Sequence, residues 1–86
     1  MKYVIDVPDY DPSEGLRLEW EINFRISTRM DDTGAIIIVA NSPGLVSLAR
    51  HLLALAQLSM PAGHHLHLDT SNSLEEGSRD LIIERE

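Results

Sequence analysis

The segment from residue 16 to residue 26, LRLEWEINFRI, alternates apolar and polar residues without a break. Because successive side chains of a β-strand point to opposite faces, this alternation predicts a strand with one buried and one solvated face. The side chains expected to point inward are Leu16, Leu18, Trp20, Ile22, Phe24 and Ile26. Those expected to point outward are Arg17, Glu19, Glu21, Asn23 and Arg25. The pattern predicts a sheet, but it carries no chemistry.

Four further segments have the character of short strands. Residues 3–7 alternate and end at a proline, and residues 64–69 and 81–84 are short and rich in apolar side chains. Residues 35–40, AIIIVA, are continuously apolar, which predicts a strand buried on both faces in the middle of the sheet. The turn residues at 31–34, DDTG, let the chain reverse before this strand.

A helix over residues 43–58 is predicted by its start and end signals. Asn41 or Ser42 can accept hydrogen bonds from the free N–H groups of the first turn, and Pro43 suits the first helical position. Pro61 and Gly63 end the helix. One narrow stripe of the helix is polar and consists of Ser47, Arg50, His51 and Gln57. The remaining surface is apolar, so the helix is expected to be buried over more than half of its circumference by Leu45, Val46, Leu48, Ala49, Leu52, Leu53, Leu55 and Ala56.

Together these elements predict one α+β domain over residues 1–86: a five-stranded mixed β-sheet (β-β-β-α-β-β) with one helix packed on one face. The third and fourth strands are expected to be parallel, with a right-handed crossover, and the strand order to be 1-2-3-5-4. One helix leaves the other face open. Either Ile36 and Ile38 or Ile37 and Val39, together with Ile82, should therefore stay exposed, as at a protein contact. In the alternative, a loop folds over this stripe.

The charge balance favours some partners over others. Fourteen acidic and seven basic side chains give a net charge of −7, spread over both halves of the chain. Such a field repels nucleic acid and accelerates encounter with a basic protein, although acidity can also serve solubility alone. No stretch approaches the ~20 apolar residues of a membrane span, and the N-terminus does not resemble a signal peptide. We therefore expect a cytoplasmic protein with no membrane or nucleic-acid partner.

The histidines suggest a metal site. His65, His67 and Asp69 share one face of a strand, next to His64, and could bind a metal if His51, Glu75 or Glu76 supplied a further ligand. Such sites need ligands from at least two elements, and the sequence shows no second pair. Alternatively, these histidines lie on an exposed edge strand while Leu66 and Leu68 pack inward. We expect no metal and no other cofactor.

Catalytic motifs are also missing. A hydrolase could be assembled from Ser71 or Ser73 with His65 and Asp69, but no strained turn or oxyanion hole accompanies these serines. There is no cysteine, and so no thiol nucleophile, disulfide or thiolate metal site. The long connection over residues 70–80 is a candidate binding loop, or a plain solvated one, with Leu74 as its anchor and Gly77 in a left-handed turn. The sequence therefore favours binding over catalysis.

A family resemblance goes further than these patterns. The strings GHHLHLD at residues 63–69, LEEGS at 74–78 and LII at 81–83 resemble the immunity protein 32 family, as do LVSLA and LLALAQ within residues 45–57. The similarity spans about residues 35–86. The resemblance implies a stand-alone bacterial protein that binds and blocks a cognate polymorphic toxin, and an acidic surface suits a basic toxin.

The residues expected to form the partner surface are Glu19, Glu21, His65, His67, Glu75 and Glu76. Two alternatives remain open: a homodimeric structural or assembly protein, and a small histidine-based metal-binding protein.

Overall fold

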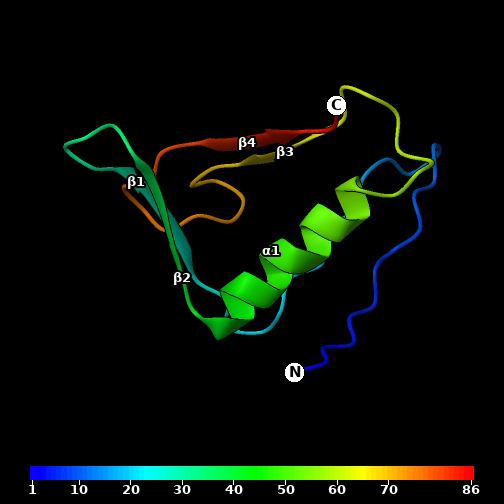
Figure 1. The fold of residues 1–86 in the computed structure, drawn as a ribbon, viewed down its shortest axis with the longest axis horizontal. Helices are drawn as coiled ribbons and strands as arrows, with labels where there is room; N and C mark the ends of the chain where they lie inside the picture. Colours follow the sequence, from blue (N-terminus) through cyan, green and yellow to red (C-terminus); the bar gives the residue numbers. More distant parts are fainter.

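The computed structural model describes residues 1–86 and contains four strands and one helix. β1 (Ile26–Met30) pairs antiparallel with β2 (Ile36–Ala40), α1 (Ser42–Leu55) follows, and β3 (His65–Leu68) pairs antiparallel with β4 (Leu81–Glu84). The α+β class and the single helix are confirmed. The five-stranded sheet is wrong, because the two hairpins form separate two-stranded sheets. α1 leads away from the end of β2 and passes below the β3–β4 hairpin in the view of Figure 1.

The β1–β2 hairpin is closed by the side chain of Asp31. Its Oδ1 accepts hydrogen bonds from the backbone N–H groups of Thr33 and Ala35, both at 2.9 Å, and from the Thr33 hydroxyl at 2.6 Å. These bonds, the hydroxyl's first, lower the pKa of the Asp31 carboxyl. Gly34 takes the positive φ of 87° that the reversal requires. The turn predicted for residues 31–34 is confirmed.

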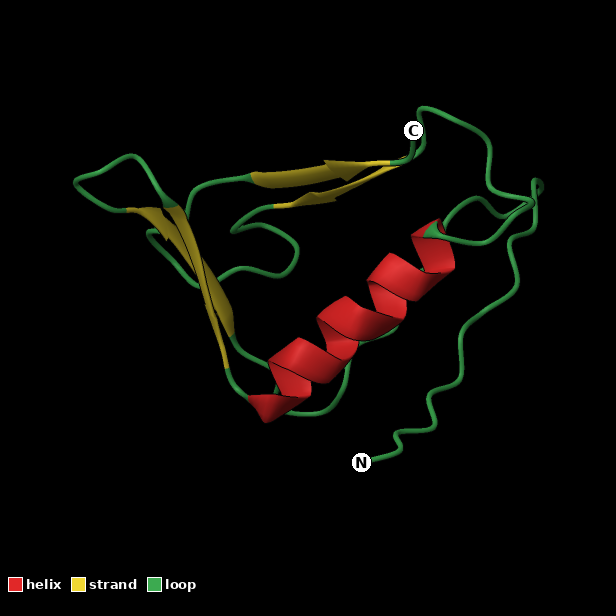
Figure 2. Ribbon diagram, viewed as in Figure 1, coloured by secondary structure: helices red, strands yellow, loops and turns green.

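The predicted strands over residues 3–7 and 16–26 are absent, except for the last residue of the second, which begins β1 (Figure 2). A turn interrupts the second segment: the N–H of Phe24 donates to the carbonyl of Glu21 at 3.3 Å, and Asn23 adopts a φ of 65°. Before the turn, Leu16, Leu18 and Trp20 pack against the core as predicted, but Ile22, which was also expected to point inward, is 84% exposed. The alternation could not predict which groups form hydrogen bonds with the backbone of this segment.

Polar side chains of α1 take the place of a neighbouring strand. The Ser47 hydroxyl accepts a hydrogen bond from the N–H of Glu21 at 2.9 Å, and Nε2 of His51 lies 2.9 Å from the carbonyl of Glu19, to which it donates. Both Ser47 and His51 are fully buried. The backbone of residues 19–21 is thus satisfied by a helix, so no ladder with another strand is needed.

The rest of the polar stripe holds the N-terminal segment in the same way. Nε of Arg50 donates to the carbonyl of Asp6 at 3.0 Å. Beyond the end of α1, the amide of Gln57 donates to the carbonyl of Pro8 at 2.8 Å and accepts from the N–H of Tyr10 at 3.0 Å. The stripe predicted from the sequence is therefore real, but it faces the first 21 residues of the chain.

This orientation corrects the predicted burial of the helix. Leu45, Leu52 and Leu53 were expected inside, yet 56%, 45% and 48% of their surfaces are exposed. These leucines face solvent because the polar stripe on the other side of the helix faces inward, where it forms hydrogen bonds with the N-terminal backbone. The helix also ends at Leu55, earlier than predicted.

The start of α1 is as predicted and does more than cap the helix. Oδ1 of Asn41 accepts from the N–H of Gly44 at 2.8 Å and from the N–H of Arg25 at 2.9 Å. Its Nδ2 donates to the carbonyl of Asn23 at 2.8 Å. One amide therefore joins the helix start to the segment that leads into β1.

Two small apolar clusters form the core. Ile26, Leu48, Leu68 and Leu74 make up the first, and Leu55, Met60 and Leu66 the second. Leu66 and Leu68 point inward from β3 as predicted, and Leu74 is the predicted anchor of its loop. Gly77 has a φ of 86°, which confirms the left-handed turn.

The loop after β3 connects the two hairpins. The N–H of Glu75 donates to the carbonyl of Ile26 at 2.8 Å, the N–H of Arg79 to the carbonyl of Thr28 at 3.3 Å, and the N–H of Thr28 to the Ser78 hydroxyl at 3.1 Å. Residues 75–79 thus run along the side of β1 that faces away from β2. β1 is flanked on both sides, whereas β2 has a single neighbour.

β2 is therefore an edge strand, and its predicted place in the middle of the sheet is wrong. It does not pair with β3, so the parallel crossover and the order 1-2-3-5-4 are also wrong. The continuous apolar run does not distinguish a central strand from an uncovered edge. Ile82 is exposed as expected. Of the two alternative pairs on β2, Ile36 and Ile38 are both exposed, but so is Val39, so both faces of the strand are accessible and not one alone.

Candidate functional site

The six residues predicted for a partner surface lie in three places. Glu19 and Glu21 belong to the irregular segment packed on α1, His65 and His67 to the outer face of β3, and Glu75 and Glu76 to the loop beside β1. All are exposed except Glu21, which is half-buried. No hydrogen bond or ion pair links side chains from different pairs. The structure presents three separate pairs and no joint cluster.

The two glutamates near α1 differ in how free their charge is. The Glu21 carboxylate forms an ion pair with the largely buried guanidinium of Arg50, with Oε1 and Nη2 3.3 Å apart. The Glu19 side chain has no such partner, although its carbonyl is fixed by His51. Glu19 therefore offers an uncompensated charge, whereas Glu21 has a structural role that competes with binding.

The loop glutamates are held on a rigid base. The Asp69 carboxylate accepts from the N–H groups of Ser71 and Asn72 at 2.9 and 3.1 Å, which fixes the start of the loop. At the other end, the N–H of Ser78 donates to the carbonyl of Glu75 at 3.1 Å. The adjacent carboxylates of Glu75 and Glu76 are exposed on this ordered turn. Binding them would therefore cost little conformational entropy of the loop.

The acidic charge of the molecule is largely uncompensated. Of fourteen acidic side chains, only Glu14, Glu21 and Asp80 form ion pairs, the last with a histidine. The surface therefore keeps a negative potential that attracts a positively charged partner and raises its association rate.

The three neighbouring histidines do not converge. His64 lies against Tyr10, with Nε2 and the phenolic oxygen 3.4 Å apart, and His65 is nearest to the carbonyl of Gly63. Only His67 meets acidic groups: its Nε2 is 3.0 Å from Oδ2 of Asp80, and Asp69 is close by. The metal site considered from the sequence reduces to these three residues, of which Asp69 is half-buried, and neither His51 nor Glu75 contributes.

No serine protease-like arrangement forms. The Ser73 hydroxyl donates to Oδ1 of Asn72 at 2.5 Å, and the Asp69 carboxylate is occupied by backbone N–H groups. No serine side chain hydrogen-bonds a histidine. The hydrolase considered from the sequence is therefore not assembled in this structure.

His51 is the one histidine with a lowered pKa, and its position explains why. Its ring is fully buried, with its centroid 4.3 Å from that of Trp20 in an edge-on arrangement, and Trp20 in turn stacks on Phe24. Burial lowers the pKa of His51, and the neighbouring Arg50 lowers it further against the opposing effect of the bond to Glu19. Its Nδ1 has no hydrogen-bond partner. The neutral ring acts as a structural clamp and not as an accessible base.

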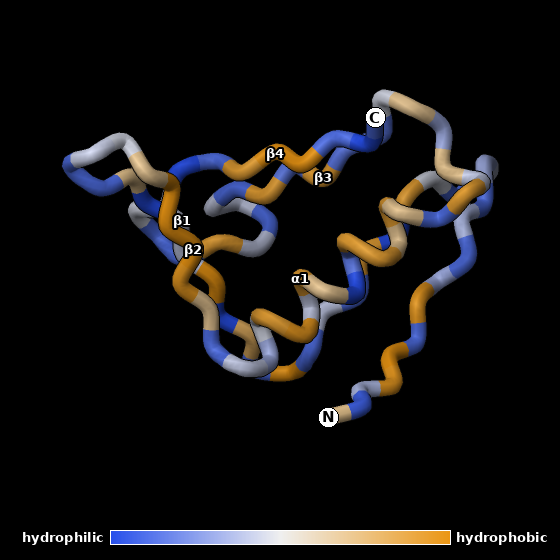
Figure 3. Tube along the Cα trace, in the orientation of Figure 1, coloured by the Kyte–Doolittle hydropathy of each residue, from blue (hydrophilic) through white to orange (hydrophobic).

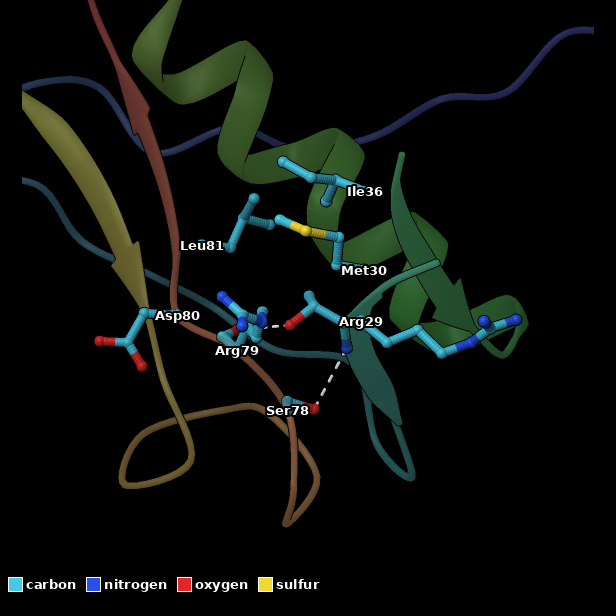
Figure 4. A pocket seen from close by; sticks show the side chains of 8 residues that line it. Arg29, Met30, Ile36, Ser78, Arg79, Asp80 and Leu81 are labelled. Carbon is cyan, nitrogen blue, oxygen red and sulfur yellow. Dashed lines mark hydrogen bonds between the residues drawn. The ribbon is translucent and has the colours of Figure 1, made fainter. Parts of the chain in front are cut away.

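Two accessible apolar features were not among the predicted site residues, although exposed side chains on β2 were expected. β2 exposes 67% of Ile36, 43% of Ile38 and 53% of Val39, and the tube in Figure 3 is strongly apolar along this strand. Beside it, a shallow hollow of about 340 Å³ is lined by Met30, Ile36 and Leu81 together with polar residues of β1 and the loop. Figure 4 shows these three apolar side chains grouped, with Asp80 directed away from them.

A second apolar hollow lies on the other side of α1. It has a volume of about 410 Å³ and is formed where the N-terminal segment passes the exposed helix face; its lining is Met1, Tyr3, Ile5, Ser42, Leu45, Val46, Ala49 and Leu53. The sequence signal for this feature was the eight apolar residues on a helix of a chain too short to cover them all. α1 has neither the length nor the unbroken apolar character of a membrane-spanning helix.

Comparison with known proteins gives one match. The model of the family described as Immunity protein 32 matches residues 35–86, which include β2, α1, β3, β4 and the loop that carries Glu75 and Glu76. No curated protein and no solved structure matches the chain.

Proposed function

The chain belongs to the immunity protein 32 family, and on this premise we propose that it neutralises a bacterial toxin by binding it directly in the cytoplasm, without catalysis. The observation that carries the proposal is the family match, which covers more than half of the chain. It supports a role in toxin neutralisation. The uncompensated acidic surface supports a positively charged partner.

Among the six candidate residues, the pair on the loop is the strongest choice for the toxin contact. Glu75 and Glu76 are exposed, lie next to each other and lack any ion pair. They lie within the matched region, whereas Glu19 and Glu21 precede it. We assign Glu19, His65 and His67 to the periphery of the contact, and Glu21 a weaker part because Arg50 already pairs with it.

The first experiment tests neutralisation itself. The protein encoded by the gene next to that of this chain is tested as the toxin: it is expressed in bacteria with and without this chain, and growth is measured. We expect growth to be restored together with stable copurification of the two proteins. Unrestored growth, or rescue without any complex, would contradict direct neutralisation.

The second experiment tests the surface. In the variant Glu75→Lys with Glu76→Lys, association with the same toxin at low salt should slow by about tenfold or more, because exposed acidic charges steer the encounter with a positively charged partner. The control carries Asp9→Lys and Asp32→Lys, which make the same change in net charge at exposed positions outside the six candidate residues. Equal slowing of both variants in stopped-flow measurements would assign the effect to net charge and remove the loop from the contact.

A further inference from the structure

The free edge of β2 carries an ordered set of unpaired backbone groups. The carbonyl groups of Ile26 and Thr28 bond to residues 75–79, so the backbone groups of these two residues point away from β2. Their register partners in β2 are Ala40 and Ile38. In an antiparallel pair, residues opposite each other share this orientation. The N–H and C=O groups of Ile38 and Ala40, and by alternation those of Ile36, therefore point outward from the free edge.

This edge has none of the features that usually protect an edge strand. Natural proteins place charged residues, prolines or bulges on such strands to prevent pairing with another chain. β2 contains only isoleucine, valine and alanine, and its register with β1 runs without a bulge. An unprotected edge of this kind is suited to accept another strand.

The charge distribution favours a second copy of this chain as that strand. Residues 33–49 contain no charged side chain, although the protein as a whole is 24% charged. A basic partner would gain nothing from this uncharged stretch. A second copy with its own charge of −7 is best accommodated here, because the acidic surfaces of the two copies meet least at an uncharged edge.

The chain has more exposed surface than a compact monomer of its size. The chain exposes 6044 Å², whereas a compact monomer of this mass exposes about 5,100 Å². Its radius of gyration is 13.6 Å, against about 12 Å for a compact domain of this length. The excess over the whole chain is about 940 Å², which leaves room for the ~800 Å² that each partner buries in a standard interface.

We propose that β2 pairs antiparallel with β2 of a second copy about a twofold axis at Ile38. The β1–β2 hairpins of the two copies then form one continuous four-stranded sheet. The outward groups impose this register: Ile38 lies opposite Ile38 of the second copy, and Ile36 opposite Ala40. Every outward N–H then meets a carbonyl. Ile36 and Ile38 share a face with Ile26, so the pairing extends the core across the axis.

A pair of cysteine variants tests this register, because the protein has no cysteine of its own. In a hydrogen-bonded antiparallel pair, facing Cα atoms are ~5.5 Å apart, within the ~4.4–6.8 Å range that a disulfide spans. Ile38→Cys should therefore form a covalent dimer on mild oxidation. Val39→Cys is the matched control: it is more exposed than Ile38, yet the two copies of residue 39 would be offset by two residues, roughly 8 Å apart.

The readouts are non-reducing electrophoresis of both variants and the solution mass of the unmodified protein by light scattering across micromolar concentrations. Dimer bands for Ile38→Cys but not for Val39→Cys, with an unmodified mass near twice 9.6 kDa, would support the proposal. Equal crosslinking of the two variants, no crosslinking of Ile38→Cys, or an unmodified protein that stays monomeric would overturn it. None of these results depends on toxin binding.

Discussion

The orientation of α1 predicts that two leucines of the same helix contribute very differently to stability. Leu48 is only 8% exposed and packs with Ile26, Leu68 and Leu74, whereas 45% of Leu52 is exposed. Replacing each by alanine changes helix propensity by the same small amount, so the difference between the variants reports burial alone.

The magnitude follows from the carbon atoms removed. At ~0.8 kcal/mol for each buried carbon, truncating Leu48 loses about 2 kcal/mol of transfer free energy, and the cavity left behind raises the cost to about 3 kcal/mol. Leu52→Ala removes atoms that are half in water and leaves no closed cavity, so its cost is about 1 kcal/mol. A chain with few buried residues should respond strongly to the first change.

Urea denaturation followed by circular dichroism measures both effects. A difference of about 2 kcal/mol corresponds to ~1–2 M in the midpoint for a domain of this size. We expect both variants to keep the slope of the unmodified protein. Equal losses for the two variants, or a larger loss for Leu52→Ala, would refute the assigned face of α1.

Two further predictions concern the segment packed on α1. Gly44→Ala should destabilise the fold by about 1–3 kcal/mol instead of giving the usual gain in a helix, because a Cβ there would lie 2.5 Å from the carbonyl oxygen of Arg25; a thermal melt at or above the unmodified midpoint would contradict this. Because burial lowers the folded-state pKa of His51, the unfolded chain takes up its proton first as the pH falls through about 6.5, so stability should decrease below that pH. Urea midpoints measured from pH 7.5 to 5 should show this decrease in the unmodified protein but not in His51→Gln, and an equal decrease in both would contradict the assignment.

The two hairpins depend on a loop for their connection, and this bears on the candidate site. Residues 75–79 bond to β1 on the edge opposite β2, so the loop that carries Glu75 and Glu76 is part of the framework. The acidic loop and the uncharged edge strand lie on opposite sides of β1. Glu75 nevertheless lines a shallow hollow together with Val39 and Ala40 of β2, so the two proposed contacts are neighbours on one face of the hairpin.

Several features of the fold follow from local patterns. The turn at 31–34, the helix start at Asn41 and the inward side chains of β3 were predictable, because each depends on residues close together in sequence. The exposed apolar side chains of β2 were predicted for the wrong reason, since an uninterrupted apolar run looks the same in a central strand and at an uncovered edge.

By itself, the sequence determined the α+β class, the helix, the two turns and the acidic charge, all of which depend on composition or short-range spacing. Only the tertiary structure decided which face of α1 is buried and where β2 lies. A prediction from periodicity places the apolar side chains of a helix inside. Here Ser47 and His51 face inward because they form hydrogen bonds with the backbone of Glu21 and Glu19, which are far away in sequence. Hydrogen bonds between distant segments leave no periodic trace, so they become visible only when the chain is folded.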